Sequence, residues 1–129
     1  DAYGPLLRAY LEAGEQVPGW AYLHAQRLRR RLAAEVAVAG EGLDAFLLPT
    51  APAPPPGRES TGDASLLAPF TLLGRPAIRL PSGLDADGLP IGVQLAGHRD
   101  RDADLLATAA WCEERLGWLA APPEPCPPI

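Results

Sequence analysis

The prolines set the tightest limit on how this chain can fold. Sixteen of its 129 residues are Pro, and five of them fall within residues 49–56. Proline fixes φ and carries no N–H, so it interrupts both helices and the interior of sheets. Regular elements must therefore lie between the prolines, and the segment APAPPPG, residues 51–57, is expected to form an extended loop.

Four of the intervening stretches have the spacing of helices. Pro5 stands where the first helix begins, a position at which the missing N–H costs nothing. A glycine follows each stretch and predicts its end. Asp100 or Asp102 is expected to cap the last helix. The predicted helices cover residues 5–13, about 20–39, 65–73 and about 103–116.

Three shorter stretches, residues 45–48, 77–80 and 91–96, predict strands, of which the first two end at a proline. The run AFLL at 45–48 is apolar on both faces, which is typical of a strand covered by helices on each side. Asp87-Gly88 predicts a hairpin turn. The fold class is therefore α/β, with helices flanking a sheet. Because a sheet averages about five or six strands, these three are expected to be part of a larger mixed sheet.

Length and charge limit the domain organisation and the partners. Residues 1–120 are expected to form one domain portion, followed by a proline-rich tail at 121–129. The net charge of −5 argues against a nucleic-acid partner. No stretch approaches 18 uninterrupted apolar residues, so no membrane partner is expected and the cytoplasm is the expected compartment. Cys112 and Cys126 are expected to be free thiols.

Three residue types are absent: Lys, Met and Asn. Without Met, Asp1 is not an ordinary translation start, so we expect a processed chain, a fragment or one module of a longer protein. Without Lys, these residues supply no Schiff base, no lysine general base and no P-loop lysine. Arg27 and Arg29–Arg31 lie in a predicted helix, where arginines spread around the cylinder, so a solvated face is favoured over an anion site.

Four ordered motifs point to a family. They are D-x-x-L-x-P-T at 44–50, G-x-P-A at 74–77, P-x-G at 81–83 and G-L-P-x-G-V-Q-L at 88–95. Together they resemble the C-terminal third of the amidase signature family of serine hydrolases. The preceding helix, with Tyr22, Ala25 and Arg29, is also similar, so the resemblance covers roughly residues 5–119.

The resemblance implies amide hydrolysis by a nucleophilic Ser, a second Ser in a cis peptide and a Lys, with an oxyanion hole in a Gly-Ser-rich segment. None of this is present, since the serines are only Ser60, Ser65 and Ser82 and no Gly-Gly-Ser-Ser run occurs. We therefore assign no catalytic residue. The expected role is to complete the sheet and pocket wall of an amidase that converts a small-molecule carboxamide to carboxylate and ammonia or amine. The expected partners are the missing N-terminal portion and that amide; self-association into a homo-oligomer is left open, and no cofactor or metal is expected.

Four residues are expected to bind substrate: Pro49, Thr50, Thr71 and Gly74. Pro49 and Thr50 end a strand, where ligands commonly meet an α/β sheet. Thr71 stands where transamidating members, which act on charged tRNA, usually have Asn, so it favours a small-molecule substrate. Its hydroxyl either contacts substrate or satisfies a loop carbonyl. A purely structural role is the alternative for all four.

Other functional interpretations are weaker. A catalytic serine–histidine–acid triad of Ser82, His98 and Asp85 or Asp100 is not favoured, because Ser82 does not stand in a nucleophile-elbow sequence. The aspartates at 100, 102 and 104 mimic a calcium loop, but Leu105 and Trp111 stand where that loop needs Gly and Glu. A non-catalytic binding or assembly module derived from the amidase fold remains the alternative function.

Overall fold

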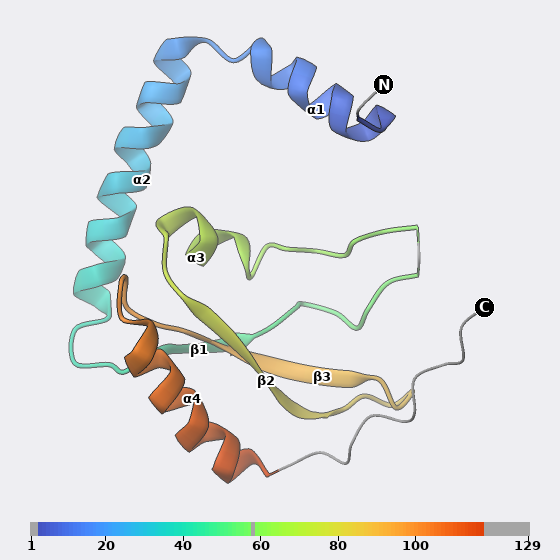
Figure 1. Ribbon diagram of the computed structural model, residues 1–129, viewed down its shortest axis with the longest axis vertical. Helices are drawn as coiled ribbons and strands as arrows, with labels where there is room; N and C mark the ends of the chain where they lie inside the picture. Colours follow the sequence, from blue (N-terminus) through green and yellow to red (C-terminus); the bar gives the residue numbers. More distant parts are fainter. Residues whose placement is uncertain (1–2, 58, 118–129) are drawn as a thin grey trace. The chain divides into compact units, whose positions relative to one another are not determined.

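The computed structural model describes residues 3–57 and 59–117, so the predicted tail and Cys126 lie outside the described residues. Within these ranges the chain has four helices and three strands (Figure 1). They divide into two compact units, one ending at Val36 and the other beginning at Ala37. The boundary falls inside the second helix. A single domain over residues 1–120 stays a prediction.

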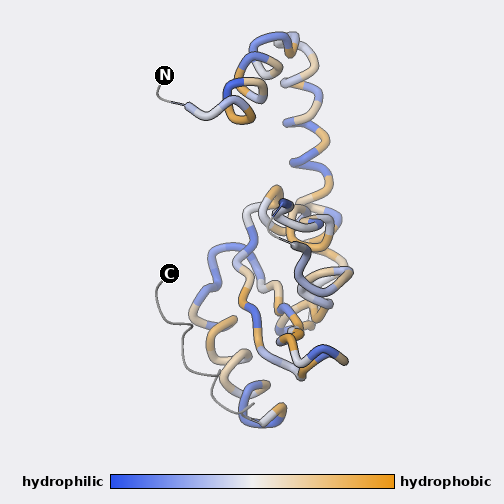
Figure 2. Tube along the Cα trace, turned by 90° about the vertical axis from the view of Figure 1, so that its right-hand side faces the viewer, coloured by the Kyte–Doolittle hydropathy of each residue, from blue (hydrophilic) through white to orange (hydrophobic). Residues whose placement is uncertain are grey.

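The first unit consists of α1 (Pro5–Glu15) and the larger part of α2 (Gly19–Ala39). Proline is the first residue of α1, as predicted, but the helix continues through Gly14 to Glu15. Apolar and polar residues alternate along both helices (Figure 2). None of their described residues is buried, and the side chain of Leu6 is 81% exposed. The apolar residues of these two helices therefore form no buried core within the described residues.

The second unit is built on a sheet of β1 (Phe46–Pro49), β2 (Ala77–Leu84) and β3 (Pro90–Ala96), in the order β1-β3-β2. Both pairings are antiparallel. The predicted hairpin is confirmed, because the Asp85 carboxylate accepts the N–H groups of Asp87 and Leu89 and Gly88 adopts a left-handed φ of 78°. With helices on both faces of this sheet, the α/β class is confirmed.

The second strand is longer than its sequence predicts. The sequence places its end before Pro81, yet the strand runs on to Leu84. The pairing with β3 shifts between Pro81 and Gly83, so the proline sits at an irregularity in the ladder. Within the described residues β2 is also an edge strand, where a missing N–H costs no hydrogen bond on the open side.

One face of the sheet packs on α4 (Asp102–Leu116). Leu105 and Ala109 of this helix bury themselves against Leu80 and Leu95 and form the core. The predicted aspartate cap is wrong: the residue before the helix is Arg101, with no side-chain cap hydrogen bond. Asp102 and Asp104 lie in the first turn instead, where a carboxylate favours the positive end of the helix dipole.

The other face packs on α3 (Ala68–Leu73), which begins three residues later than predicted. Phe46 alternates with Leu47 along β1, so its ring points away from α4, and it lies 6.2 Å from the ring of Phe70. The guanidinium of the buried Arg75 lies over the Phe46 ring, with its Cζ 5.5 Å from the ring centroid. Arg75 also donates to the carbonyl of Gly97 at 3.0 Å. Figure 1 shows the two helices on opposite sides of the strands.

Candidate functional site

A groove of about 600 Å³ opens where β1 ends. The extended proline loop forms one wall and the β2–β3 hairpin forms the other. Thr50 continues the sheet beyond Pro49 by donating its N–H to the carbonyl of Gly92 at 3.0 Å. The described lining comprises residues 49–56, 61–63 and 90–93 together with Leu67, Arg79 and Ser82. Two of the four expected substrate-binding residues, Pro49 and Thr50, therefore lie in this groove.

Thr50 carries an unpaired polar atom. Its Oγ1 is buried and has no hydrogen-bond partner within the described part of the chain. A hydroxyl both donates and accepts, and leaving it buried and unpaired costs stability. Such atoms are rare in folded proteins, and none of the described residues explains this one. The proline rings beside it offer an apolar surface.

Arg79 and Asp63 bring charge to the described lining of the groove. Arg79 donates to the carbonyl of Pro90 at 3.3 Å and makes no ion pair with another described residue. Its side chain crosses Gly92 so closely that a Cβ there would lie 2.5 Å from the Arg79 Nε and 2.9 Å from the Leu80 carbonyl oxygen. Glycine is required at this position because the neighbouring strand leaves no room for a side chain.

The variant Gly92→Ala is expected to lower the free energy of unfolding by about 1–3 kcal/mol, the usual cost of overpacking. Urea unfolding followed by circular dichroism measures it. Gly83→Ala is the matched control in the same hairpin, because its Cβ would meet only Ile91 at an ordinary 3.7 Å. Equal losses of stability in the two variants would show that the close approach at Gly92 has no energetic consequence.

The carboxylate of Asp63 is held by its own turn. Its Oδ1 accepts the backbone N–H of Ser65 at 2.7 Å, and this hydrogen bond lowers the pKa of Asp63 below its ordinary value. A depressed pKa means that the turn is stabilised above the ordinary pKa and loses that stabilisation as the pH falls through the folded pKa. Asp63 is therefore ionised in the groove at neutral pH.

An NMR titration of the Asp63 carboxyl carbon is expected to give a pKa below that of the same residue in the urea-unfolded chain. The unfolded chain is the control because it lacks the Ser65 hydrogen bond. A folded pKa equal to or above the unfolded one would contradict the geometry of this turn.

The other two expected residues, Thr71 and Gly74, do not line the groove. Thr71 donates its hydroxyl to the carbonyl of Leu67 at 3.3 Å, one turn earlier in the chain. Gly74 ends α3 with a φ of 66°. The hydrogen bond of Thr71 and the left-handed φ of Gly74 both agree with a purely structural role, the alternative that the sequence left open. Substrate contact by either residue stays a prediction.

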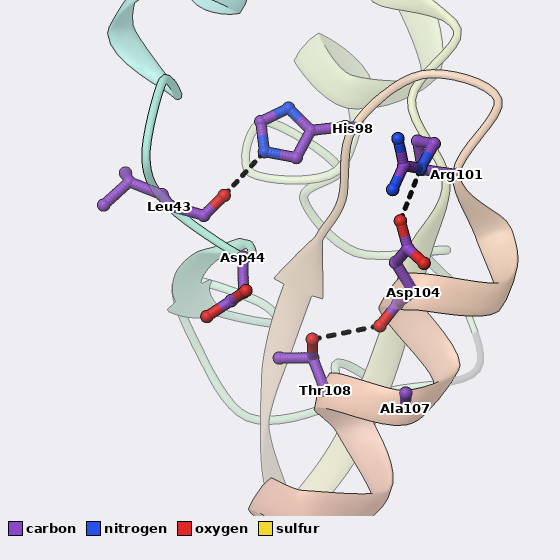
Figure 3. Close-up of a pocket in the computed structure, with 7 residues that line it drawn as sticks. All are labelled: Leu43, Asp44, His98, Arg101, Asp104, Ala107 and Thr108. Atoms are coloured by element: carbon purple, nitrogen blue, oxygen red, sulfur yellow. Dashed lines mark hydrogen bonds and ion pairs between the residues drawn. The ribbon is translucent and has the colours of Figure 1, made fainter.

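A second cavity, of about 440 Å³, lies between the loop before β1 and the start of α4 (Figure 3). His98 Nε2 donates to the carbonyl of Leu43 at 2.7 Å, Arg101 pairs with Asp104, and Thr108 donates to the Asp104 carbonyl at 3.0 Å. Sequence reasoning missed this cluster. Its only signal was the charged turn at 98–102.

The candidate serine–histidine–aspartate triad is not assembled, because Ser82 lines the groove whereas His98 lines the second cavity. His98 is also engaged with a backbone carbonyl.

No group of three or more His, Cys, Asp or Glu side chains in residues 3–57 and 59–117 is placed to hold a metal ion. Cys112 is a free, partly buried thiol beside the core. Among the same residues no helix is long and apolar enough to cross a membrane.

A sequence model of the amidase family matches residues 2–106. Among curated proteins, a glutamyl-tRNA(Gln) amidotransferase subunit from Roseobacter denitrificans is 38% identical over 94 residues, covering 66% of this chain and 19% of that protein. The corresponding subunit from Neisseria meningitidis serogroup A is 37% identical over 110 residues, and the match covers 80% of this chain and 23% of that subunit. The chain thus spans about a fifth of the length of these relatives.

Solved structures give the same result for the fold. The crystal structure of an amidase superimposes with a TM-score of 0.79 at 34% identity, covering 89% of this chain and 29% of the amidase. The 6-aminohexanoate cyclic dimer hydrolase superimposes with a TM-score of 0.72 at 30% identity, covering 88% and 28% of the two chains. Since the family match extends over most of the sequence, the chain belongs to the amidase family.

Proposed function

We propose that this chain forms the substrate-pocket wall of an amidase that hydrolyses a small-molecule carboxamide to carboxylate and ammonia or amine. The observation that carries this proposal is the groove at the end of β1, where Thr50 presents a buried hydroxyl with no partner among the described residues. The groove lies within the residues that match the amidase family. Pockets beyond strand ends are common ligand sites in α/β proteins.

The catalytic groups of this amidase come from outside these residues. A serine nucleophile needs a base that accepts its proton and donors aimed at the developing oxyanion. The chain has no Lys, and Ser82, the serine in the described lining of the groove, has no described His beside it there. This chain covers only 19% of the Roseobacter subunit and 29% of the solved amidase, which supports placing the catalytic groups outside these residues. We call this chain together with the segment that supplies the catalytic serines and lysine the complete amidase.

Within the complete amidase, the groove binds and orients the amide. The Thr50 hydroxyl is able to donate to a substrate carbonyl or to accept from a substrate N–H. The proline loop excludes water from the apolar part of the substrate. Such contacts act on binding and orientation, whereas the bond-breaking step belongs to the catalytic serine.

A small molecule is favoured over charged tRNA as the substrate. The net charge of −5 does not suit a nucleic-acid backbone, and Thr71 replaces the Asn usual in the transamidating members that the sequence resembles. The relatives in Roseobacter and Neisseria are named glutamyl-tRNA(Gln) amidotransferase subunits, so the two substrate classes need a direct test.

The complete amidase is expected to release ammonia or amine from small carboxamides, with no requirement for tRNA. Thr50→Val, which removes the hydroxyl and keeps the shape, is expected to raise KM about three- to tenfold through a lost hydrogen bond. Thr108→Val is the matched control, since its hydroxyl lies in the second cavity. Turnover that requires glutamyl-tRNA would contradict the small-molecule substrate, and equal KM values for the two variants would contradict the role of the groove.

A further inference from the structure

Gln94 is a polar side chain in the most buried part of the molecule. It lies on the central strand β3 and is only 1% exposed. Its Nε2 donates to the carbonyl of Leu66 at 2.9 Å and to that of Pro49 at 3.3 Å. A carbonyl oxygen only accepts hydrogen bonds, so the NH₂ of the amide must face these two groups.

The two carbonyls belong to the two ends of the loop that borders the groove. Pro49 ends β1 and Leu66 precedes Leu67, and both Pro49 and Leu67 line the groove. Apart from isolated turns, the described chain between them has no helix or strand. The amide of Gln94 therefore joins the base of the loop at both ends, although it does not itself line the groove.

The other half of the same amide is left without a partner. The Oε1 of Gln94 is buried and accepts no hydrogen bond within the described residues. An unsatisfied buried acceptor costs stability, and an apolar residue of similar size avoids that cost. A glutamine at this position is therefore explained by its NH₂ donors and not by its packing.

We propose that Gln94 is a positioning residue: its NH₂ ties the end of β1 to the segment before α3 and so fixes the width of the groove for the substrate. It makes no contact with the substrate. The part of this inference that concerns substrate rests on the proposed function, whereas the tie between the two carbonyls concerns the chain alone.

The test uses the complete amidase and the variant Gln94→Met, which keeps the length of the side chain and removes the donors. Hydrogen exchange of peptides from residues 50–67 is expected to become about tenfold faster, because two hydrogen bonds at the base of the loop are lost. KM is expected to rise about tenfold with kcat within twofold, since the groove loses its shape and the catalytic groups lie elsewhere. Leu95→Met is the control for destabilisation, because Leu95 packs on the opposite face of β3.

A second variant gives a signature that simple packing does not. In Gln94→Glu the carboxyl group faces two carbonyl oxygens, and only its protonated form donates, to one of them. The charged residue opposite it on β2 is Arg79, which donates to the carbonyl of Pro90. Its KM, divided by that of the wild-type protein, is therefore expected to fall as the pH is lowered, while the same ratio for Gln94→Met stays constant. A pH-independent ratio for Gln94→Glu would overturn the proposal.

The remaining outcomes are also decisive. Wild-type exchange of residues 50–67 in Gln94→Met would overturn the tie, and faster exchange with an unchanged KM would overturn the positioning role. Equal changes in Leu95→Met would assign both effects to general destabilisation. A wild-type protein that hydrolyses no amide would overturn the proposed function. The hydrogen-exchange measurement alone would then show whether Gln94 holds the carbonyls of Pro49 and Leu66 together.

Discussion

The 129-residue chain, purified without any other polypeptide, is expected to release no product from simple aryl amides above a heat-killed control. The physical reason is the missing proton path. No Lys is present to act as a base, and the resemblance to amidases implies a Ser–Ser–Lys set of which these residues hold no counterpart. The expected effect is a complete loss of turnover and not a reduced rate.

The measurement is a colorimetric assay for released arylamine, run beside the complete amidase at equal molar concentration. The complete amidase is the positive control, because it shows that the substrate suits the pocket. Turnover by the chain alone that scales with its concentration and disappears on heating would contradict the division of labour that we propose.

Leu105→Ala is expected to lower the free energy of unfolding by about 2–5 kcal/mol, the range for removing a buried leucine side chain. Leu105 is 3% exposed and packs with Leu80 and Leu95 in the core between α4 and the sheet. The backbone of Gly97 also lies against it, since a Cβ at Gly97 would come within 3.1 Å of the Leu105 Cβ.

Urea unfolding followed by circular dichroism measures this loss. Leu106→Ala is the matched control because it makes the same substitution one residue later, at a side chain that is 58% exposed. Its effect is expected to stay within about 0.5 kcal/mol, apart from helix propensity. Similar losses in the two variants would mean that the core does not lie between α4 and the sheet.

The helices and strands could be predicted from the sequence because their signals are local. Pro5, Gly40 and Gly117 mark helix ends, and the Asp87-Gly88 pair marks the hairpin. The extension of β2 past Pro81 could not be predicted. It depends on the shifted pairing with β3 and on the position of β2 at an edge of the described sheet, which are properties of the folded chain.

The candidate site was predictable where it depends on strand ends and not where it depends on side-chain direction. Pro49 and Thr50 lie in the groove because they are the last residues before the chain leaves the sheet. Thr71 lies one helical turn from its hydrogen-bond acceptor, so its hydroxyl donates to the carbonyl of Leu67, the residue before α3. The bonds of Gln94 to Leu66 and of His98 to Leu43 join residues 28 and 55 positions apart, and no local pattern reveals such pairs.

Labelling of the native protein with a serine-directed fluorophosphonate, followed by peptide mass spectrometry, tests the central claim most directly. We predict a single modified serine on a peptide outside these 129 residues, with its modification slowed by a competing carboxamide substrate. Modification of Ser60, Ser65 or Ser82 that the same substrate slows would contradict the account, because it would place the nucleophile in the chain that we describe as the pocket wall.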